Sequence, residues 1–265
     1  MNKYKKYVGI LLILSMLTIN VMAEPNAGHR PKILAGTSSG ISTNWAGYAL
    51  DSPVASVTDV KGSWVVPGVS CVRGKAQYSS FWTGIDGDRS NTVEQIGTDS
   101  DCNNGKGTYY AWYEFYPNPS HLVPVPVSPG DKISAEVSYG TVSGLFTVSI
   151  TNLRTGKNFS TSSAVSGAQR NSAEWIAEAP SSFFGILPLA NFGIAKYGFD
   201  YTGDINTNFA TINGANGNIS SFSPSTSVNV NEITMVNNFG TAVKAQPSGL
   251  SDGTSFLVQW YSKGP

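Results

Sequence analysis

Short β-like runs separated by turn residues are the feature of this chain that most constrains its fold. From Ile41 onward, apolar and polar residues alternate in runs such as "NWAGYAL", "KISAEVSY" and "LFTVSITNL". Dipeptides such as Pro129-Gly130 and Asp252-Gly253 separate the runs, and no long segment has convincing helical periodicity. Many short strands joined by regular turns are typical of an antiparallel sandwich or barrel. We therefore expect one all-β domain over residues 41–265.

The first 40 residues are expected to lie outside this domain. Lys3, Lys5 and Lys6 precede an apolar run and a small residue, Ala23, which is the pattern of a secretory signal peptide over residues 1–23. Residues 24–40 are polar, with scattered Pro and Gly, and indicate a linker or a short pro-segment. The apolar run is short for a membrane anchor, so we expect a secreted protein without a membrane-bound part.

Charge argues against nucleic acid as a partner. The full chain has 17 basic and 17 acidic residues, and removal of residues 1–23 takes away three basic ones, which leaves 14 against 17. A mildly acidic chain without a basic tract has no electrostatic footprint for nucleic acid. We expect polypeptide substrates, a monomer, and no cofactor.

The two cysteines, Cys71 and Cys102, are expected to form a disulfide. An exported chain meets oxidising conditions, which favours a disulfide over two free thiols. Neither cysteine has a second Cys or a His nearby in the sequence, so a metal site is not expected.

Three other motifs lack the surrounding sequence that their chemistry would need. Gly36–Gly40 matches the G-x-S-x-G pattern, but it lies in a polar segment and not between a strand and a helix. A Ser-His-Asp or Cys-His catalytic site would have to use His121, because His29 falls in the expected linker. The stretch Asp99–Gly105 resembles a calcium loop with a misplaced glycine, and a solvated turn is the better interpretation.

Carboxylate, amide and aromatic side chains share strand faces in three segments. Alternation places Trp82 with Asp86 in "FWTGIDGD", and Trp112 with Glu114 in "YYAWYEFYP", while Gln95 lies in "NTVEQIG". A sandwich core would not accept these polar groups, and a solvent face rarely gathers so many aromatic side chains. The combination indicates a substrate cleft.

Five motifs in order, "TNWAGY", "FWTGIDGD", "VEQIGTD", "YYAWYEFYP" and "AEWIAE", resemble those of the glutamic peptidases, also called eqolisins. The resemblance covers most of residues 41–262. It implies a β-sandwich of two antiparallel sheets, concanavalin-like or jelly-roll-like, with the active site on the concave face. It also implies a secreted, metal-independent peptidase.

The resemblance also implies site residues. The catalytic glutamine of the family matches Gln95 and the catalytic glutamate matches Glu178, which ends "AEWIAE". Residues that line the cleft of the family match Trp45, Trp82, Asp86, Trp112 and Glu114. Tyr110 stands where fungal members typically carry an aspartate.

The two glutamates of "AEWIAEAP" need an explanation, because like charges four residues apart repel. Glu178 is expected to activate water, with Gln95 as a donor to the oxyanion, at acidic pH. For Glu174 the simplest interpretation is a solvent-facing side chain. A jelly-roll glycoside hydrolase using Glu114 and Glu178, or a non-catalytic lectin-like module that binds carbohydrate, are the alternatives.

Overall fold

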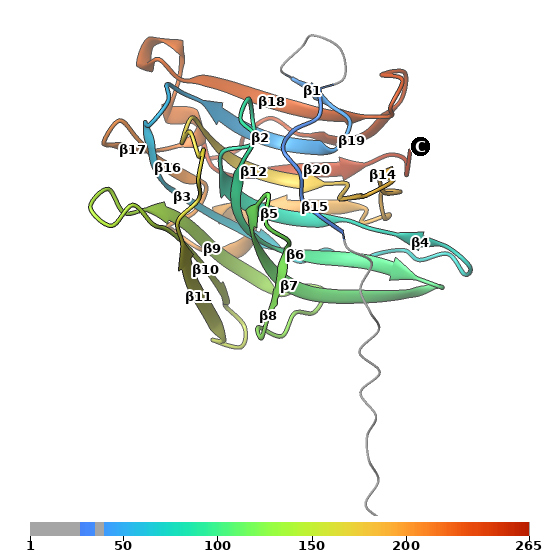
Figure 1. Ribbon diagram of the computed structural model, residues 1–265. Helices are drawn as coiled ribbons and strands as arrows, with labels where there is room; N and C mark the ends of the chain where they lie inside the picture. Colours follow the sequence, from blue (N-terminus) through green and yellow to red (C-terminus); the bar gives the residue numbers. More distant parts are fainter. Residues whose placement is uncertain (1–26, 35–39, 265) are drawn as a thin grey trace, which may run out of the picture.

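The structure is a computed structural model, in which residues 27–34 and 40–264 are described. The expected signal peptide, residues 1–23, and most of the Gly36–Gly40 motif lie outside these ranges. The fold is a sandwich of two antiparallel sheets, which confirms the all-β prediction (Figure 1). Among the described residues, no helix combines the length and apolar character needed to cross a membrane.

The first layer, here called the site sheet, carries the candidate residues. Its strands follow the order β18–β2–β12–β5–β6–β7–β8, and β4 continues the position of β5 beside β6. Their bounds are β2 Trp45–Asp51, β4 Ala76–Gln77, β5 Ser80–Ile85, β6 Val93–Asn103, β7 Lys106–Tyr116, β8 His121–Val123, β12 Ser172–Glu178 and β18 Asn229–Val236.

The second layer, the back sheet, is built around β3, which pairs with β9 on one side and with β15 and β16 on the other. β18 joins the layers, because its first half pairs with β2 and its end pairs with β19. The other bounds are β1 Ile41–Ser42, β3 Val57–Val65, β9 Lys132–Tyr139, β10 Phe146–Asn152, β11 Asn158–Ser163, β15 Ile194–Tyr197, β16 Phe209–Ile212, β17 Ala215–Asn218, β19 Val243–Pro247 and β20 Phe256–Trp260.

Within residues 27–34 and 40–264, helical structure is confined to the four-residue helix α1, Phe199–Thr202, and two 3-10 turns, Ile219–Ser221 and Pro224–Thr226. A small hairpin of β13, Ser181–Ser182, and β14, Gly185–Ile186, follows β12. It lies close to the end of β12 and so can reach over the site sheet.

Burial differs between the two layers. β10 alternates strictly between buried and half-buried residues, as expected for a strand with one face on the core. Every residue of β2, β5 and β12 is buried. One face of these central strands packs on the core between the sheets, so something else must cover the other face.

The disulfide expected between Cys71 and Cys102 is present. It ties the segment before β4 to the end of β6, and β4 pairs with β6 at Gln77 and Cys102. The two cysteines are 31 residues apart, and the closed loop contains Gln95.

We expect the double variant Cys71→Ser/Cys102→Ser to lose about 2–5 kcal/mol of unfolding free energy, because the unfolded chain regains loop entropy. Urea unfolding of wild type and variant measures the difference. A loss below about 1 kcal/mol would show that the bond constrains little.

Candidate active site

The outer face of the site sheet gathers the polar and aromatic side chains expected from the sequence. Trp45, Trp82 and Trp112 lie there with Val93 and Ile176, whereas Trp175 packs into the core between the sheets. Alternation along β12 puts Glu174 and Glu178 on the same outer face as Ile176. The face with carboxylate, amide and aromatic side chains that the sequence predicted over β5, β6 and β7 therefore exists.

Gly97 makes room for two indoles on this face. It lies opposite Trp82 on β5 and opposite Trp112 on β7. A Cβ atom at this position would lie 2.6 Å from Cβ of Trp82 and 2.9 Å from a ring carbon of Trp112. A glycine at the centre of "VEQIGTD" thus allows both tryptophans to sit beside the candidate glutamine.

Residues 27–34, here called the cleft segment, cover this face. Gly28 pairs with Ser181 of β13 through two backbone hydrogen bonds of 2.8 and 2.9 Å. His29 is only 2% exposed, and its ring stacks on Trp112 at a centroid distance of 3.5 Å. In Figure 1 the segment crosses in front of the site sheet. The sequence suggested only a linker or pro-segment here, and gave His29 no role.

Gln95 and Glu178 meet at one peptide group of the cleft segment. Nε2 of Gln95 donates to the carbonyl oxygen of His29 at 2.7 Å. The backbone N–H of Arg30 donates to Oε1 of Glu178 at 3.1 Å. The two side chains come from different strands, β6 and β12, with β5 between them. Both are completely buried.

Three other candidate residues, Glu114, Trp82 and Trp45, form hydrogen bonds that position Gln95, Glu178 and the cleft segment. Oε2 of Glu114, which lies opposite Gln95 on β7, accepts hydrogen bonds from Nε2 of Gln95 at 3.1 Å and from N–H of His29 at 3.0 Å. The indole of Trp82 donates to Oε2 of Glu178 at 2.9 Å. The indole of Trp45 donates to the carbonyl of Arg30 at 3.1 Å.

Asp86 has a different position from the other candidates. Its carboxylate accepts three backbone N–H groups, from Gln169, Arg170 and Asn171, in the loop that leads into β12. It therefore fixes the start of β12. Asp99, which the sequence interpretation placed on a solvated turn, is instead buried in β6 and accepts the indole N–H of Trp112 at 2.6 Å.

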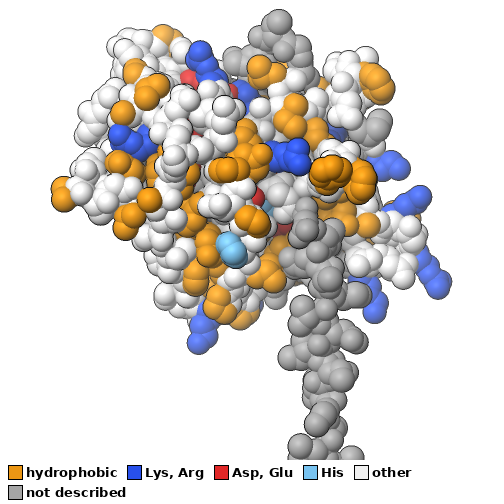
Figure 2. Space-filling model, viewed as in Figure 1, with side chains coloured by type: hydrophobic (Ala, Val, Ile, Leu, Met, Phe, Trp, Pro, Cys, Tyr) orange, Lys and Arg blue, Asp and Glu red, His pale blue; other side chains and the backbone are white. Residues whose placement is uncertain are grey.

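Carboxyl groups are concentrated under the cleft segment. The buried acidic side chains here include Asp51, Asp88, Asp99, Asp101, Glu114, Glu174 and Glu178. On the face in Figure 2, few acidic side chains are visible, whereas Lys and Arg side chains project into solvent. These carboxyl groups are thus turned inward, under the cleft segment.

The environment of Glu178 shifts its pKa upward. Burial raises the pKa of this carboxyl from 4.5 to about 8, and the charges of Glu114 and Asp99 act in the same direction. The cationic ring of His29 and the hydrogen bond from Trp82 oppose the shift. For His29, burial opposes the charged form, but the carboxylates of Asp99 and Glu114 outweigh it and raise the pKa to about 10.

Glu174 is buried, so the expectation that it faces solvent is wrong. Burial raises its pKa well above 4.5, and the negative charges of Asp86, Asp88 and Asp51 add to the effect. The sequence pattern could not reveal this, because it does not show whether the outer face of a strand is covered.

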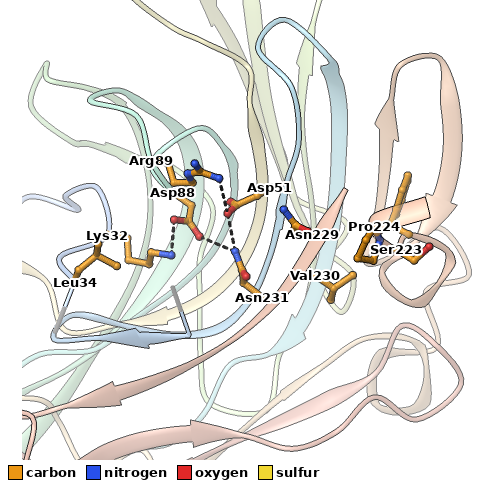
Figure 3. Close-up of a pocket in the computed structure, with 11 residues that line it drawn as sticks. Lys32, Leu34, Asp51, Asp88, Arg89, Ser223, Pro224, Asn229, Val230 and Asn231 are labelled. Atoms are coloured by element: carbon orange, nitrogen blue, oxygen red, sulfur yellow. Dashed lines mark hydrogen bonds and ion pairs between the residues drawn. The ribbon is translucent and has the colours of Figure 1, made fainter. Parts of the chain in front are cut away.

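A hollow of about 640 Å³ lies at the carboxyl end of the cleft segment, and neither Gln95 nor Glu178 lines it. Lys32 forms an ion pair with Asp88 at its wall, and Asn231 donates to Asp51 at 2.7 Å (Figure 3). The hollow continues the face on which residues 28–30 cover Gln95 and Glu178.

The model of the peptidase A4 family matches residues 43–244 of this chain. The chain belongs to the peptidase A4 family. It is 31% identical to aspergillopepsin-2 of Aspergillus niger over 189 residues, which are 63% of this chain and 66% of that protein. It is 36% identical to scytalidopepsin B of Scytalidium lignicola over 145 residues, 52% of each chain. The chain thus spans slightly less than two thirds of the first relative and about half of the second.

A solved structure agrees with this assignment. Scytalido-glutamic peptidase, determined with a transition state analog inhibitor, superposes with a TM-score of 0.65 at 25% identity, covering 83% of this chain and 98% of that one. The resemblance to glutamic peptidases inferred from the motifs is therefore confirmed.

We predict that the folded protein is more stable in acid than at neutral pH. Glu178, Asp59 and Asp51 have pKa values raised to about 8, 7 and 6. The unfolded chain releases these protons at lower pH than the folded one, so stability is complete below about pH 4 and falls as pH rises to 8. We expect the melting temperature at pH 8 to be at least about 3 °C lower than at pH 4.

The variant Glu174→Gln tests whether buried carboxyl groups cause this pH dependence of stability. It replaces a buried carboxyl by a neutral amide, so the decrease in melting temperature between pH 4 and pH 8 should become smaller. An unchanged decrease would show that burial does not raise the pKa of Glu174.

Proposed function

We propose that this protein is a secreted endopeptidase that hydrolyses peptide bonds with Gln95 and Glu178 at acidic pH. The observation that carries the proposal is the peptide group between His29 and Arg30. Its carbonyl oxygen accepts from Gln95, and its nitrogen lies 3.1 Å from Oε1 of Glu178. A peptide bond to be hydrolysed needs a donor at its oxygen and a proton carrier at its nitrogen.

Glu178 is proposed as general base and then general acid. The ionised carboxyl takes a proton from water, which attacks the carbonyl carbon, and then returns the proton to the leaving nitrogen. A carboxyl with a raised pKa gives up and regains a proton more readily near the working pH. Water in an uncovered cleft weakens the burial effect on Glu178, while loss of the cleft segment also removes the opposing charge of His29.

Gln95 is proposed as the oxyanion donor. A neutral amide adds no positive charge that would lower the pKa of the base. Its Oε1 is buried and accepts no hydrogen bond from the described residues, which leaves an acceptor that can orient the attacking water. Glu114 fixes the amide by accepting from Nε2.

The contacts in the cleft favour a peptide over a sugar substrate. Backbone groups of the cleft segment bond to Ser181, Glu114 and Trp45, a pattern that recognises extended main chain. A glycoside hydrolase using Glu114 and Glu178 would have no need for Gln95. Membership of the peptidase A4 family supports the same choice.

We expect Gln95→Ala and Glu178→Gln each to lower kcat on denatured casein by at least about 10²-fold, because each removes a group that acts in the transition state. Cleavage is measured between pH 2 and 7. The matched control is Gln246→Ala, an exposed glutamine of β19, which should keep wild-type activity.

Retention of most activity by Gln95→Ala would contradict the peptidase mechanism. Hydrolysis of a polysaccharide, with no cleavage of casein, would favour the glycosidase alternative.

We also expect Glu114→Gln to move the acidic limb of the rate profile to lower pH. The charge of Glu114 raises the pKa of Glu178, so its removal lets Glu178 ionise at lower pH. The profile of kcat/KM between pH 2 and 7 measures the shift. A limb that moves to higher pH would show that another group sets it.

A further inference from the structure

We propose that the hollow lined by Asp51 and Asp88 is a subsite that binds a lysine or arginine side chain of the substrate. That residue is the third one on the carboxyl side of the cleaved bond. The inference rests on the proposed function, and it adds a preference for substrates that carry a cation at this position.

The cleft segment shows where each residue of a bound peptide lies relative to the dyad. The peptide group between His29 and Arg30 lies between Gln95 and Glu178. Counted from this group, Lys32 is the third residue on the carboxyl side, and its backbone N–H donates to the carbonyl of Gly87 at 3.0 Å. This hydrogen bond uses main-chain atoms, so a substrate with any residue other than proline here can form it. The side chain of that residue then points where the side chain of Lys32 points.

The ion pair of Lys32 shows which side chain this position accepts. The side chain of Lys32 is only 2% exposed, and it pairs with Asp88, which is completely buried. Asp88 belongs to the loop between β5 and β6, so the pair joins the cleft segment to the site sheet. A buried carboxylate is costly without a partner of opposite charge. A substrate that displaces Lys32 therefore binds best when it brings a cation of its own.

A second carboxyl group, that of Asp51, is placed for the same ligand. Asp51 is 5% exposed, and its Oδ1 accepts no hydrogen bond from any residue that the structure describes. Nδ2 of Asn231 donates to Oδ2 of Asp51 at 2.7 Å and lies 3.5 Å from Oδ2 of Asp88, so it bridges the two carboxyl groups (Figure 3). A buried acceptor without a donor, next to an ion pair, suits an ammonium or guanidinium group, which has several N–H donors.

The hollow has room for a guanidinium group as well as for an ammonium group. It measures about 640 Å³ with Lys32 at its wall. Arg89 also lines it, but the side chain of Arg89 is 67% exposed, and its Nη1 lies 3.8 Å from Oδ2 of Asp51. An ion pair so open to water contributes little. The cation that compensates the buried carboxyl groups is therefore supplied by the peptide in the cleft.

The test varies one residue of a peptide substrate. A casein fragment with a single cut site is synthesised with Lys, Gln or Glu at the third position after the cut, and kcat/KM is measured with the full-length protein. The assay uses the highest pH at which casein is cleaved, because burial raises the pKa of Asp51 to about 6 and acid neutralises this carboxyl group. We expect kcat/KM for the Lys peptide to exceed that for the Gln peptide by at least about tenfold, and the Glu peptide to be slowest.

The ratio of two peptides is a robust readout. Any fraction of molecules in which the cleft segment covers the dyad lowers kcat/KM for all three peptides by the same factor, so the ratio does not change. Moving the lysine to the fifth position after the cut should abolish its advantage. An advantage that persists there would indicate a general attraction of cations to the protein, and would overturn the subsite.

The variant Asp88→Asn identifies the group responsible. It keeps the shape of the side chain and removes its charge, so the ratio of the Lys peptide to the Gln peptide should fall below about threefold. Asp51→Asn should also lower this ratio, and it serves as the second variant if Asp88→Asn does not fold. The matched control, Asp200→Asn, changes an exposed aspartate of α1 and should keep the wild-type ratio. Equal rates for the Lys and Gln peptides in wild type, or an unchanged ratio in the folded variants, would contradict the proposal.

The two proposals fail in different ways. If casein cleavage depends on Gln95 and Glu178 while the Lys and Gln peptides are cleaved equally well, the subsite is wrong and the peptidase function stands. If casein is not cleaved at any pH between 2 and 7, the proposed function fails, and the subsite fails with it.

Discussion

The burial of many carboxyl groups on one face of a sheet is the constraint on which the rest of this structure depends. Removing a carboxylate from water is costly unless hydrogen bonds or opposite charge compensate. The chain supplies donors directly: the indole of Trp82 bonds to Glu178, the indole of Trp112 bonds to Asp99, and three backbone N–H groups bond to Asp86. Tryptophan suits this position because its ring is apolar and its N–H is polar.

The same burial links stability, chemistry and the occupation of the cleft. A carboxyl that is hard to ionise keeps its proton to higher pH, as seen for Glu178 and Glu174. Carboxylates stabilise a nearby cation, which is why His29 is buried here and has a raised pKa. The cleft segment thus provides both the cover and the positive charge that this face requires. The raised pKa of Glu178 and the buried position of His29 therefore have one physical origin.

Much of the site could be predicted from the sequence, because side chains alternate between the two faces of a strand. Alternation in "YYAWYEFYP" put Trp112 and Glu114 on one face, and the structure has them there. Spacing did not distinguish Glu174 from Glu178, because both lie on the same face of β12; only the resemblance to the glutamic peptidases selected Glu178. The prediction for Glu174 was wrong because alternation says which face a residue takes and nothing about what covers that face.

The sequence by itself determined an all-β chain, strand faces that combine carboxyl and aromatic groups, and a disulfide between its two cysteines, whereas the division into two sheets was implied only by the resemblance to the glutamic peptidases. These follow from local periodicity, turn residues and composition, which act over a few residues. Only the tertiary structure decided that Gln95 and Glu178 meet at one peptide group, and that this group belongs to His29 and Arg30. Gln95 is 66 positions from His29 in the sequence, and Glu178 is 148 positions from Arg30. The strand pairing that brings such distant residues together leaves no local signal in the sequence.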